Sequence, residues 1–376
     1  MDIDNKSKAE RNIGLEWLRI CSMLMIILLH SIDHSGLLEN LVLGSPLYYY
    51  EQFLYALVQV CVNCFVLISG YFLVNSKFKF EKLISLWIEV VFYSLIIKIV
   101  MMALGEIPFS VISLVSCFVP VLTGRYWFLT IYFGMYLLSP FINIAIKAMN
   151  EKQHRELLIL LFILFSVMIS IHPSFKGMNS GSGWGLTWFI VLYFIAAYIR
   201  LHYRSDDHCI KSLVLFFICP FLMLVALWGA QKLGVSSLIV IAQNLWRYDS
   251  ALVLVASIAI FIAFLNNNSL KSRRMEQIII RVSAATFGVY LIHAHADMCT
   301  EKMWQRMGII SNLNFQWFPL YQLGLILIIF IVCVILDIIR VNVFGLLGIN
   351  QIPAKVIKIL QHLFMRGSTN EDGYKN

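Results

Sequence analysis

The stretch Glu16-Trp-Leu-Arg19-Ile-Cys-Ser-Met-Leu-Met-Ile-Ile-Leu-Leu-His30 is an apolar run of membrane-helix character that contains an acid, a guanidinium and an imidazole. Polar side chains inside a bilayer are costly, and they usually face a protein interior or a water-filled cavity. Because successive helical residues turn by about 100°, Arg19 and His30 share one face, roughly 16 Å apart along the axis, with Glu16 one turn before Arg19. The run predicts a membrane helix with a functional face. The alternative is that Arg19 snorkels to the cytoplasmic interface and His30 bonds a neighbouring helix.

The composition places the chain among membrane proteins. Of its 376 residues, 60% are hydrophobic and 13% are charged, and the mean hydropathy is +0.80. Its apolar runs repeatedly reach the roughly 20 residues that a bilayer-spanning helix needs. The net charge of +8 is dispersed among short loops, which argues against a nucleic-acid partner. We therefore predict an all-α polytopic membrane protein that contacts the lipid bilayer and binds no nucleic acid.

Hydropathy and length predict ten membrane helices. Their expected bounds are residues 13–33, 50–74, 82–105, 126–147, 155–172, 184–201, 212–230, 248–266, 277–296 and 316–340. With the amino terminus inside, the segments expected in the cytoplasm contain most of the 29 lysines and arginines, as the positive-inside rule requires. We therefore expect both termini in the cytoplasm, positions near Asn179 outside and positions near Asn268 inside.

The remaining segments are expected to lie at the membrane surface. Residues 107–123 are apolar but short and contain Pro108 and Pro120, which favours a re-entrant or interfacial piece on the outer side. No small-residue cleavage site follows the first apolar run, so we expect it to be retained. We place a ten-helix domain at residues 1–342, and an amphipathic helix with a disordered cytoplasmic tail at residues 343–376. No loop is long enough for a soluble domain, and we expect none.

Other polar residues in the predicted helices have structural explanations. The eight cysteines lie in or beside apolar segments, and we interpret them as small buried hydrophobic residues without a disulfide framework. Glu89 and Lys98 are two further intramembrane charges. Asp337 and Arg340, three residues apart, are expected to form a salt bridge with each other.

The second helix ends on the cytoplasmic side with Ser69, Gly70 and Tyr71, and Lys82 follows soon after. The glycine permits close backbone approach, the hydroxyls can bond a ligand, and Lys82 lies where a phosphorylated cytoplasmic ligand would arrive. A tight helix crossing and an ordinary positive-inside loop explain the same residues without a ligand.

The outer ends of two other helices contain aromatic and basic residues. Arg125 and Trp127 open the fourth helix, and tryptophan and tyrosine faces beside an arginine are suited to holding a sugar ring. An aromatic belt at the outer interface is the alternative. In the ninth helix, Tyr290 and His293 lie near the outer end, at a depth similar to that of His30.

A metal site is not expected among these histidines. His30, His293 and His295 are candidate zinc ligands by residue type, but His-x-His directs its two imidazoles to opposite sides of a helix. No further ligand is suitably spaced.

The pattern resembles acyltransferase family 3, integral membrane proteins that acylate cell-surface glycans and related acceptors in bacteria. The resemblance covers about residues 11 to 340 and rests on Glu16, Arg19 and His30, on Ser69-Gly70-Tyr71, on Tyr126-Trp127-Phe128-Leu129 with the later Leu-Leu-Ser-Pro, and on Thr286 to His293. It implies that His30 is the catalytic histidine and that Arg19 and the Ser-Gly-Tyr element lie on the acyl-coenzyme A side. It also implies an O-acyl, commonly O-acetyl, sugar product and a multi-pass location in the bacterial cytoplasmic membrane.

The chain differs from many relatives in two respects. It has lysines where they have an arginine-rich loop after Ser-Gly-Tyr, and it lacks the extracytoplasmic hydrolase-like domain that some of them carry. Acylation would then be completed within the membrane part or by a partner.

The chemistry agrees with the resemblance. Transfer of an acyl group from a thioester to a hydroxyl needs a base near neutral pKa, and histidine is suited to that role. His30 would act as a general base or carry the acyl group covalently, and both routes stay open. The rival class is a transporter or flippase for a glycan or lipid-linked sugar, which makes no bond.

The predicted site has a donor part and an acceptor part. The donor residues are Glu16, Arg19, Ser69, Gly70, Tyr71 and Lys82, and the acceptor residues are Arg125, Trp127, Tyr290 and His293. We expect no bound cofactor: acyl-coenzyme A, in the first place acetyl-coenzyme A, is a co-substrate. The acceptor is a surface glycan or lipid-linked sugar, and a homo-oligomer is one option for the assembly.

Overall fold

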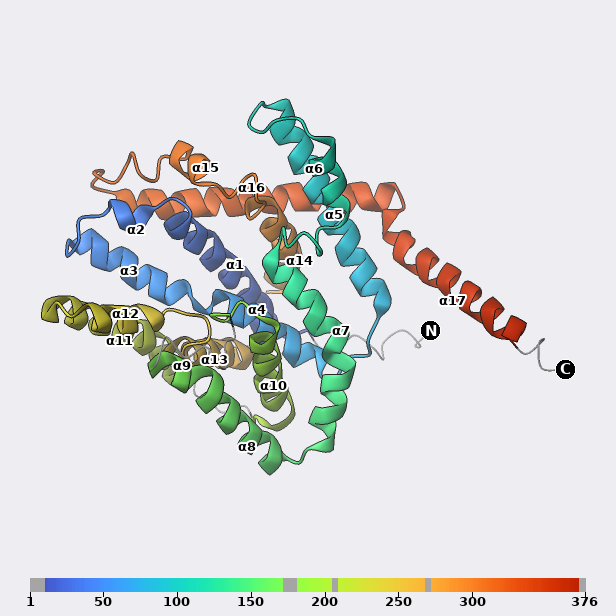
Figure 1. The fold of residues 1–376 in the computed structure, drawn as a ribbon, viewed down its shortest axis with the longest axis horizontal. Helices are drawn as coiled ribbons and strands as arrows, with labels where there is room; N and C mark the ends of the chain where they lie inside the picture. The colour runs from blue at the N-terminus through green and yellow to red at the C-terminus, as the bar shows by residue number, and fades with distance from the viewer. Residues whose placement is uncertain (1–10, 172–180, 205–208, 268–271, 372–376) are drawn as a thin grey trace.

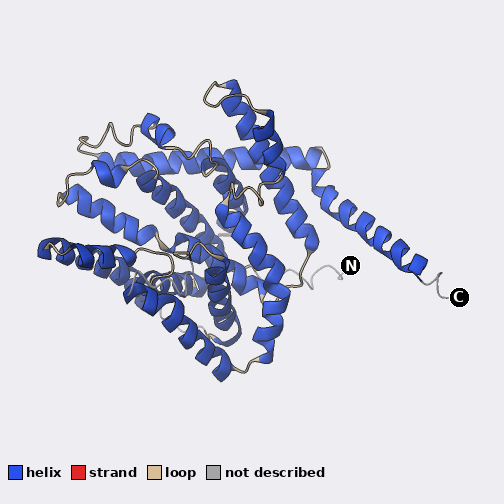
Figure 2. Cartoon of the chain, in the orientation of Figure 1, coloured by secondary structure: helices blue, strands red, loops and turns tan. Residues whose placement is uncertain are grey.

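The computed structural model describes residues 11–171, 181–204, 209–267 and 272–371 (Figure 1). Within these ranges the regular elements are helices, and Figure 2 shows no strand among them. The expectation of an all-α polytopic membrane protein is confirmed.

The helices follow one another through short connections. They are α1 (Ile13–Asp33), α2 (Leu37–Asn40), α3 (Pro46–Val58), α4 (Val60–Leu73), α5 (Phe80–Ala103), α6 (Val111–Val115), η1 (Ser116–Phe118), α7 (Trp127–Ala148), α8 (Glu151–Phe162), η2 (Ile163–Val167), α9 (Met168–Ile171), α10 (Leu186–His202), α11 (Cys209–Leu233), α12 (Ser236–Asn244), α13 (Ala251–Asn266), α14 (Arg273–His293), α15 (Glu301–Arg306), α16 (Phe318–Leu346), η3 (Ile349–Gln351) and α17 (Ile352–Glu371).

These elements account for all ten predicted membrane helices. In the described part of the chain, 8 helical stretches are long and apolar enough to cross a bilayer, and α10 and α13 are two shorter apolar helices. The second span consists of α3 and α4, and the fifth consists of α8, η2 and α9. Each of the ten coincides with an expected helix to within a few residues.

Helix α1 lies in the middle of the fold, packed against α3, α4, α13, α14 and α16 (Figure 1). Its start is fixed by Asn12, whose side chain accepts the Leu15 N–H at 2.9 Å and donates to the Leu265 carbonyl at 3.1 Å. At Gly14, an added Cβ would be 1.8 Å from the carbonyl oxygen of Phe264. Only glycine lets α1 approach the end of α13 this closely, so the amino end of the stretch that carries Arg19 is held in place.

The helix ends that are predicted to lie on the outer side of the membrane are close to one another in the structure. The ring of His30, near the end of α1, is 5.2 Å from that of His293, at the end of α14. Trp127, at the start of α7, stacks on Trp184 just before α10 and on Tyr248 just before α13. The distribution of basic residues places all five of these helix ends on the outer side.

The orientation of the chain is testable by cysteine labelling. Asn179 and Asn268, near which the sides were predicted, lie outside the described residues, but Leu43 and Glu151 are exposed in connections expected outside and inside. A Leu43→Cys protein should react with a membrane-impermeant maleimide in intact cells, and a Glu151→Cys protein only after permeabilisation. The chain without either substitution measures the background from its own cysteines. The reverse labelling pattern would contradict the topology.

The apolar segment 107–123 is not a span. It contains the short helices α6 and η1, which pack alongside the outer half of α5 (Figure 1). Its side chains Phe109, Ile112 and Leu122 are exposed, whereas Cys117 is buried. This agrees with the expected re-entrant or interfacial piece.

The end of the described chain consists of two helices. Helix α16 continues to Leu346, so the boundary expected at residue 342 falls inside a helix, and α17 begins at Ile352. Helix α17 contacts α5 and points away from the other helices (Figure 1). It extends to Glu371, into the stretch expected to be a disordered tail, and residues 372–376 lie outside the described chain.

Arg340 joins two acids from different helices. Its guanidinium is 2.7 Å from Asp337 and 2.8 Å from Glu89, and the hydroxyl of Tyr93 donates to Asp337 at 2.7 Å. The expected Asp337–Arg340 pair is therefore part of a larger network that connects α5 with α16. Gly288 of α14 packs against it, because an added Cβ there would be 2.0 Å from an oxygen of Asp337.

A second set of ion pairs fixes the connection between α14 and α16 to the outer end of α5. Lys98 is 2.7 Å from Asp297, and Lys302 is 3.1 Å from Glu106. Arg306 also bonds Glu106. Hydrogen bonds from Arg306 and Lys302 hold the pKa of Glu106 below its usual range. The loop that follows the end of α14 is thus positioned from α5.

Candidate functional site

A cavity of about 450 Å³ lies among α1, α4, α5, α7 and α14. Arg19 and His30 both line it, so it extends along roughly 16 Å of α1. Ser69, near the end of α4, and Lys82, near the start of α5, also line it, and both of these helix ends are expected to face the cytoplasm. The shared face predicted for Arg19 and His30 is therefore a cavity wall.

The inner part of the cavity contains an oriented arginine. Arg19 is 3.0 Å from Glu16, and its guanidinium lies 5.8 Å from the ring centre of Phe72. Glu16 also accepts a hydrogen bond from Ser283 of α14 and does not line the cavity. Glu16, held by Ser283, therefore positions the guanidinium of Arg19 from the side away from the cavity. Arg19 and Lys82 both line the cavity.

The three residues of the Ser-Gly-Tyr element, Ser69, Gly70 and Tyr71, have different surroundings. Ser69 lines the cavity. Gly70 packs against α10, where an added Cβ would be 2.9 Å from the Cβ of Ala196. Tyr71 accepts a hydrogen bond of 2.9 Å from Arg200 and does not line the cavity. The structure therefore places one of these three predicted donor residues at the cavity wall and gives the other two packing and bonding roles.

The outer part of the cavity contains the histidines of α1 and α14. The ring of His30 is 5.0 Å from that of His34 and 5.2 Å from that of His293. Nδ1 of His30 is buried and makes no hydrogen bond within the described chain. His293 lies behind His30, outside the cavity lining, with Nδ1 at 2.6 Å from the Val289 carbonyl. Since a carbonyl only accepts, His293 carries its proton on Nδ1.

Three of the four predicted acceptor residues line the cavity: Arg125, Trp127 and Tyr290. The guanidinium of Arg125 donates to Ser116 at 2.9 Å and to Cys117 Sγ at 3.3 Å, so the 107–123 segment holds it in place. Tyr290 is buried beside Phe128, with ring centres 5.9 Å apart.

Three aromatic rings stack beside the outer part of the cavity. The rings of Trp127 and Trp184 are 4.7 Å apart and inclined by 22°, and those of Trp127 and Tyr248 are 6.4 Å apart and inclined by 16°. All three residues line the cavity, and Trp184 is half exposed. They form an apolar aromatic wall of the outer part of the cavity, against which a ring-shaped ligand can pack.

Four lining residues that bear on the chemistry of the site, Trp184, Tyr248, Cys299 and His34, were not among the predicted site residues. Trp184, Tyr248 and Cys299 precede or follow helices far from α1 in the chain, and the sequence contains no local signal that unites them. His34 had a signal, because it is one helical turn beyond His30. Burial raises the pKa of the Cys299 thiol to about 11. Among the residues described, the potential metal ligands that come together are His30, His34 and Cys299, and not His30, His293 and His295.

The fold and the cavity define a multi-pass membrane protein in which a histidine and an arginine of one helix face a common internal space. The family model Acyl_transf_3, described as an acyltransferase domain, matches residues 12–338. The chain belongs to acyltransferase family 3 and is a membrane-embedded acyltransferase. The comparisons with curated proteins and with solved structures found no match.

Proposed function

We propose that this acyltransferase moves an acetyl group from acetyl-coenzyme A to a hydroxyl of a cell-surface glycan or lipid-linked sugar, in the bacterial cytoplasmic membrane. The observation that carries the proposal is the single cavity shared by Arg19, His30 and the aromatic rings around Trp127. One continuous space lets a donor and an acceptor approach the same imidazole from opposite ends.

The donor enters from the side of Arg19. Arg19 and Lys82 are cations at that end of the cavity, and guanidinium and ammonium groups bind phosphate oxygens. With the nucleotide there, the thioester reaches His30 at the end of the pantetheine arm, whose extended length is comparable with the roughly 16 Å rise from Arg19 to His30. Glu16 contributes by orienting Arg19.

The acceptor occupies the outer part of the cavity. The stacked rings of Trp127, Trp184 and Tyr248 offer an apolar face for a sugar ring, and Arg125 offers hydrogen-bond donors to its oxygens. In this arrangement an acceptor hydroxyl lies next to His30.

His30 activates that hydroxyl. As the hydroxyl oxygen bonds the thioester carbonyl carbon, an imidazole nitrogen takes the hydroxyl proton, and the carbon–sulfur bond breaks to release coenzyme A, which regains a proton as the thiol. In the covalent alternative, the imidazole bonds the acyl carbon first and the sugar oxygen replaces it afterwards. The absence of a hydrogen bond at Nδ1 of His30 within the described chain supports either role.

The function is tested with purified protein in proteoliposomes. The protein is incubated with acetyl-labelled acetyl-coenzyme A and a cell-envelope glycan extract, and label in the glycan fraction is measured. Transfer of label supports the proposal, and movement of glycan without label transfer supports the transporter alternative. Omitting the glycan and measuring label on the protein separates the covalent route from direct transfer.

The two ends of the cavity predict opposite kinetic effects. Arg19→Ala should raise KM for acetyl-coenzyme A more than KM for the acceptor, because it removes a phosphate contact, and Arg125→Ala should do the reverse. Steady-state kinetics with each substrate varied in turn measure both constants. Arg155→Ala, which removes an exposed arginine of α8, is the matched control and should change neither. An unchanged donor KM in the Arg19→Ala protein contradicts the donor assignment.

A further inference from the structure

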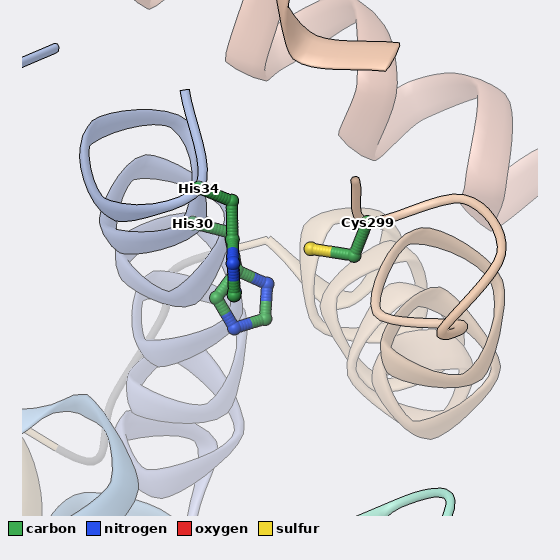
Figure 3. Close-up of side chains that lie close together, drawn as sticks. All are labelled: His30, His34 and Cys299. Atoms are coloured by element: carbon green, nitrogen blue, oxygen red, sulfur yellow. The ribbon is translucent and has the colours of Figure 1, made fainter. Parts of the chain in front are cut away.

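Two imidazoles and a thiol meet at the outer part of the cavity. His30, His34 and Cys299 each offer one ligand atom, and these atoms all lie within 4.8 Å of one another. Figure 3 shows His30 on α1, His34 at the end of that helix, and the Cys299 sulfur directed toward them from the chain that follows α14. Three ligand atoms this close together are suitable for binding a single metal ion.

The backbone holds His30, His34 and Cys299 in place before any ion binds. His34 caps α1, and its N–H donates to the His30 carbonyl at 3.0 Å, so both imidazoles leave one helical face. The Cys299 N–H donates to the His295 carbonyl at 2.8 Å, and the same loop is held to α5 by the Lys98–Asp297 ion pair. Cys299 is a free cysteine.

We propose that His30, His34 and Cys299 form a binding site for Zn²⁺ or a similar soft divalent ion. Imidazole nitrogen and thiolate sulfur are the ligands that Zn²⁺ prefers, and three protein ligands with an open fourth position are an established zinc arrangement. On binding, Cys299 releases its thiol proton to solvent and both imidazoles bind through unprotonated nitrogens. No electron is transferred. Because the group lines the cavity, an ion reaches it from the space that the acceptor uses.

Zn²⁺ bound at this site inhibits acyl transfer, and this part of the inference rests on the proposed function. The nitrogen lone pair of His30 that binds a metal is unavailable as a base or nucleophile. Zinc bound to His30, His34 and Cys299 therefore switches acyl transfer off, and its removal restores transfer. The site would make the activity respond to free zinc on the outer side of the membrane.

Binding is tested first, without reference to activity. Purified protein in detergent is titrated with Co²⁺, which gives an intense thiolate-to-cobalt absorption band when sulfur is a ligand. The wild type should bind one ion with this band. Cys299→Ala should lose the band, and His34→Ala should bind Co²⁺ at least about tenfold more weakly because one of three ligands is gone. Cys21→Ala, which removes a thiol of α1 that does not line the cavity, should behave as the wild type.

The metal titration tests the binding site, and the activity measurements test whether the bound ion inhibits acyl transfer. Absence of the band in the wild type, or its persistence in Cys299→Ala, overturns the site, and thermal unfolding checks that each variant is folded. Zn²⁺ should then inhibit acyl transfer by the wild type and by Cys21→Ala, and a chelator should reverse it, whereas Cys299→Ala should stay active at the same zinc concentration. A wild type that binds Co²⁺ through sulfur but is insensitive to zinc overturns the regulatory role. A wild type with no transfer at all contradicts the proposed function and leaves the Co²⁺ result standing.

Discussion

The His30→Ala protein is expected to lose acyl transfer, with kcat/KM lower by at least about 100-fold, because the imidazole proposed to take the acceptor proton or to carry the acyl group is gone. Its expression and melting temperature should stay close to those of the wild type. Nδ1 of His30 makes no hydrogen bond within the described chain, so its removal leaves no protein partner unpaired there. Initial rates with labelled acetyl-coenzyme A and a thermal unfolding curve in detergent measure the two quantities.

His154 of α8 provides the matched control. It is a fully buried histidine whose Nε2 contacts the Phe194 carbonyl at 3.1 Å, and it does not line the cavity. His154→Ala should lower the melting temperature through lost packing and a lost hydrogen bond, yet retain transfer activity. If the His30→Ala protein keeps most of its activity, the catalytic assignment of His30 is wrong.

The Arg340→Met protein is expected to be less stable than the wild type by about 3–5 kcal/mol, because Asp337 and Glu89 would stay buried without their shared cation. The side chains of Arg340, Glu89 and Asp337 are 12%, 15% and 1% exposed, so solvent screens the loss only weakly. The melting temperature in detergent, followed by tryptophan fluorescence or a thiol-reactive dye, measures the effect.

Lys152→Met is the control for this second substitution. It breaks the pair between Lys152 and Glu156, which is 3.9 Å apart, with side chains 75% and 60% exposed. Exposed pairs of this kind contribute little, so its melting temperature should equal that of the wild type. An Arg340→Met protein as stable as the wild type would show that the two acids are protonated or solvated and that the network is unimportant for the fold.

The helices were predictable because their signal is local. A membrane span needs about 20 apolar residues in sequence, and the basic residues between spans report their order across the bilayer. The cavity-facing stripe of α1 was predictable for the same reason, since 3.6 residues per turn place Arg19 and His30 on one side. These inferences use only the sequence of each helix and of the loops next to it.

The pairings between helices were not predictable in this way. Glu89 binds Arg340 from 251 positions away, and no spacing rule relates the two. Tyr71 is a predicted donor residue, and its hydroxyl accepts a hydrogen bond from Arg200, 129 positions further along the chain. In each case the tertiary packing of two helices selects the partner, and hydropathy contains no information on which helices are neighbours.

The same limit applies to the site. Glu16 was expected to contact the donor because it precedes Arg19 by one turn, and the structure gives it Arg19 and Ser283 as partners. Ser283 lies on α14, so its approach to α1 is a matter of packing. A residue type suited to a ligand is equally suited to orienting the residue that binds it, and the sequence does not separate the two roles.

The contact of Gly288 with Asp337 bears on how the enzyme can be redesigned. One side of α14 touches the ion network at Gly288, while Thr286 and Tyr290 of the same helix line the cavity. Any larger residue at position 288 would displace the whole helix and with it the cavity wall. Variants intended to accept a bulkier acceptor should therefore shorten side chains on the cavity side, such as Phe287 or Trp184, and leave position 288 as glycine.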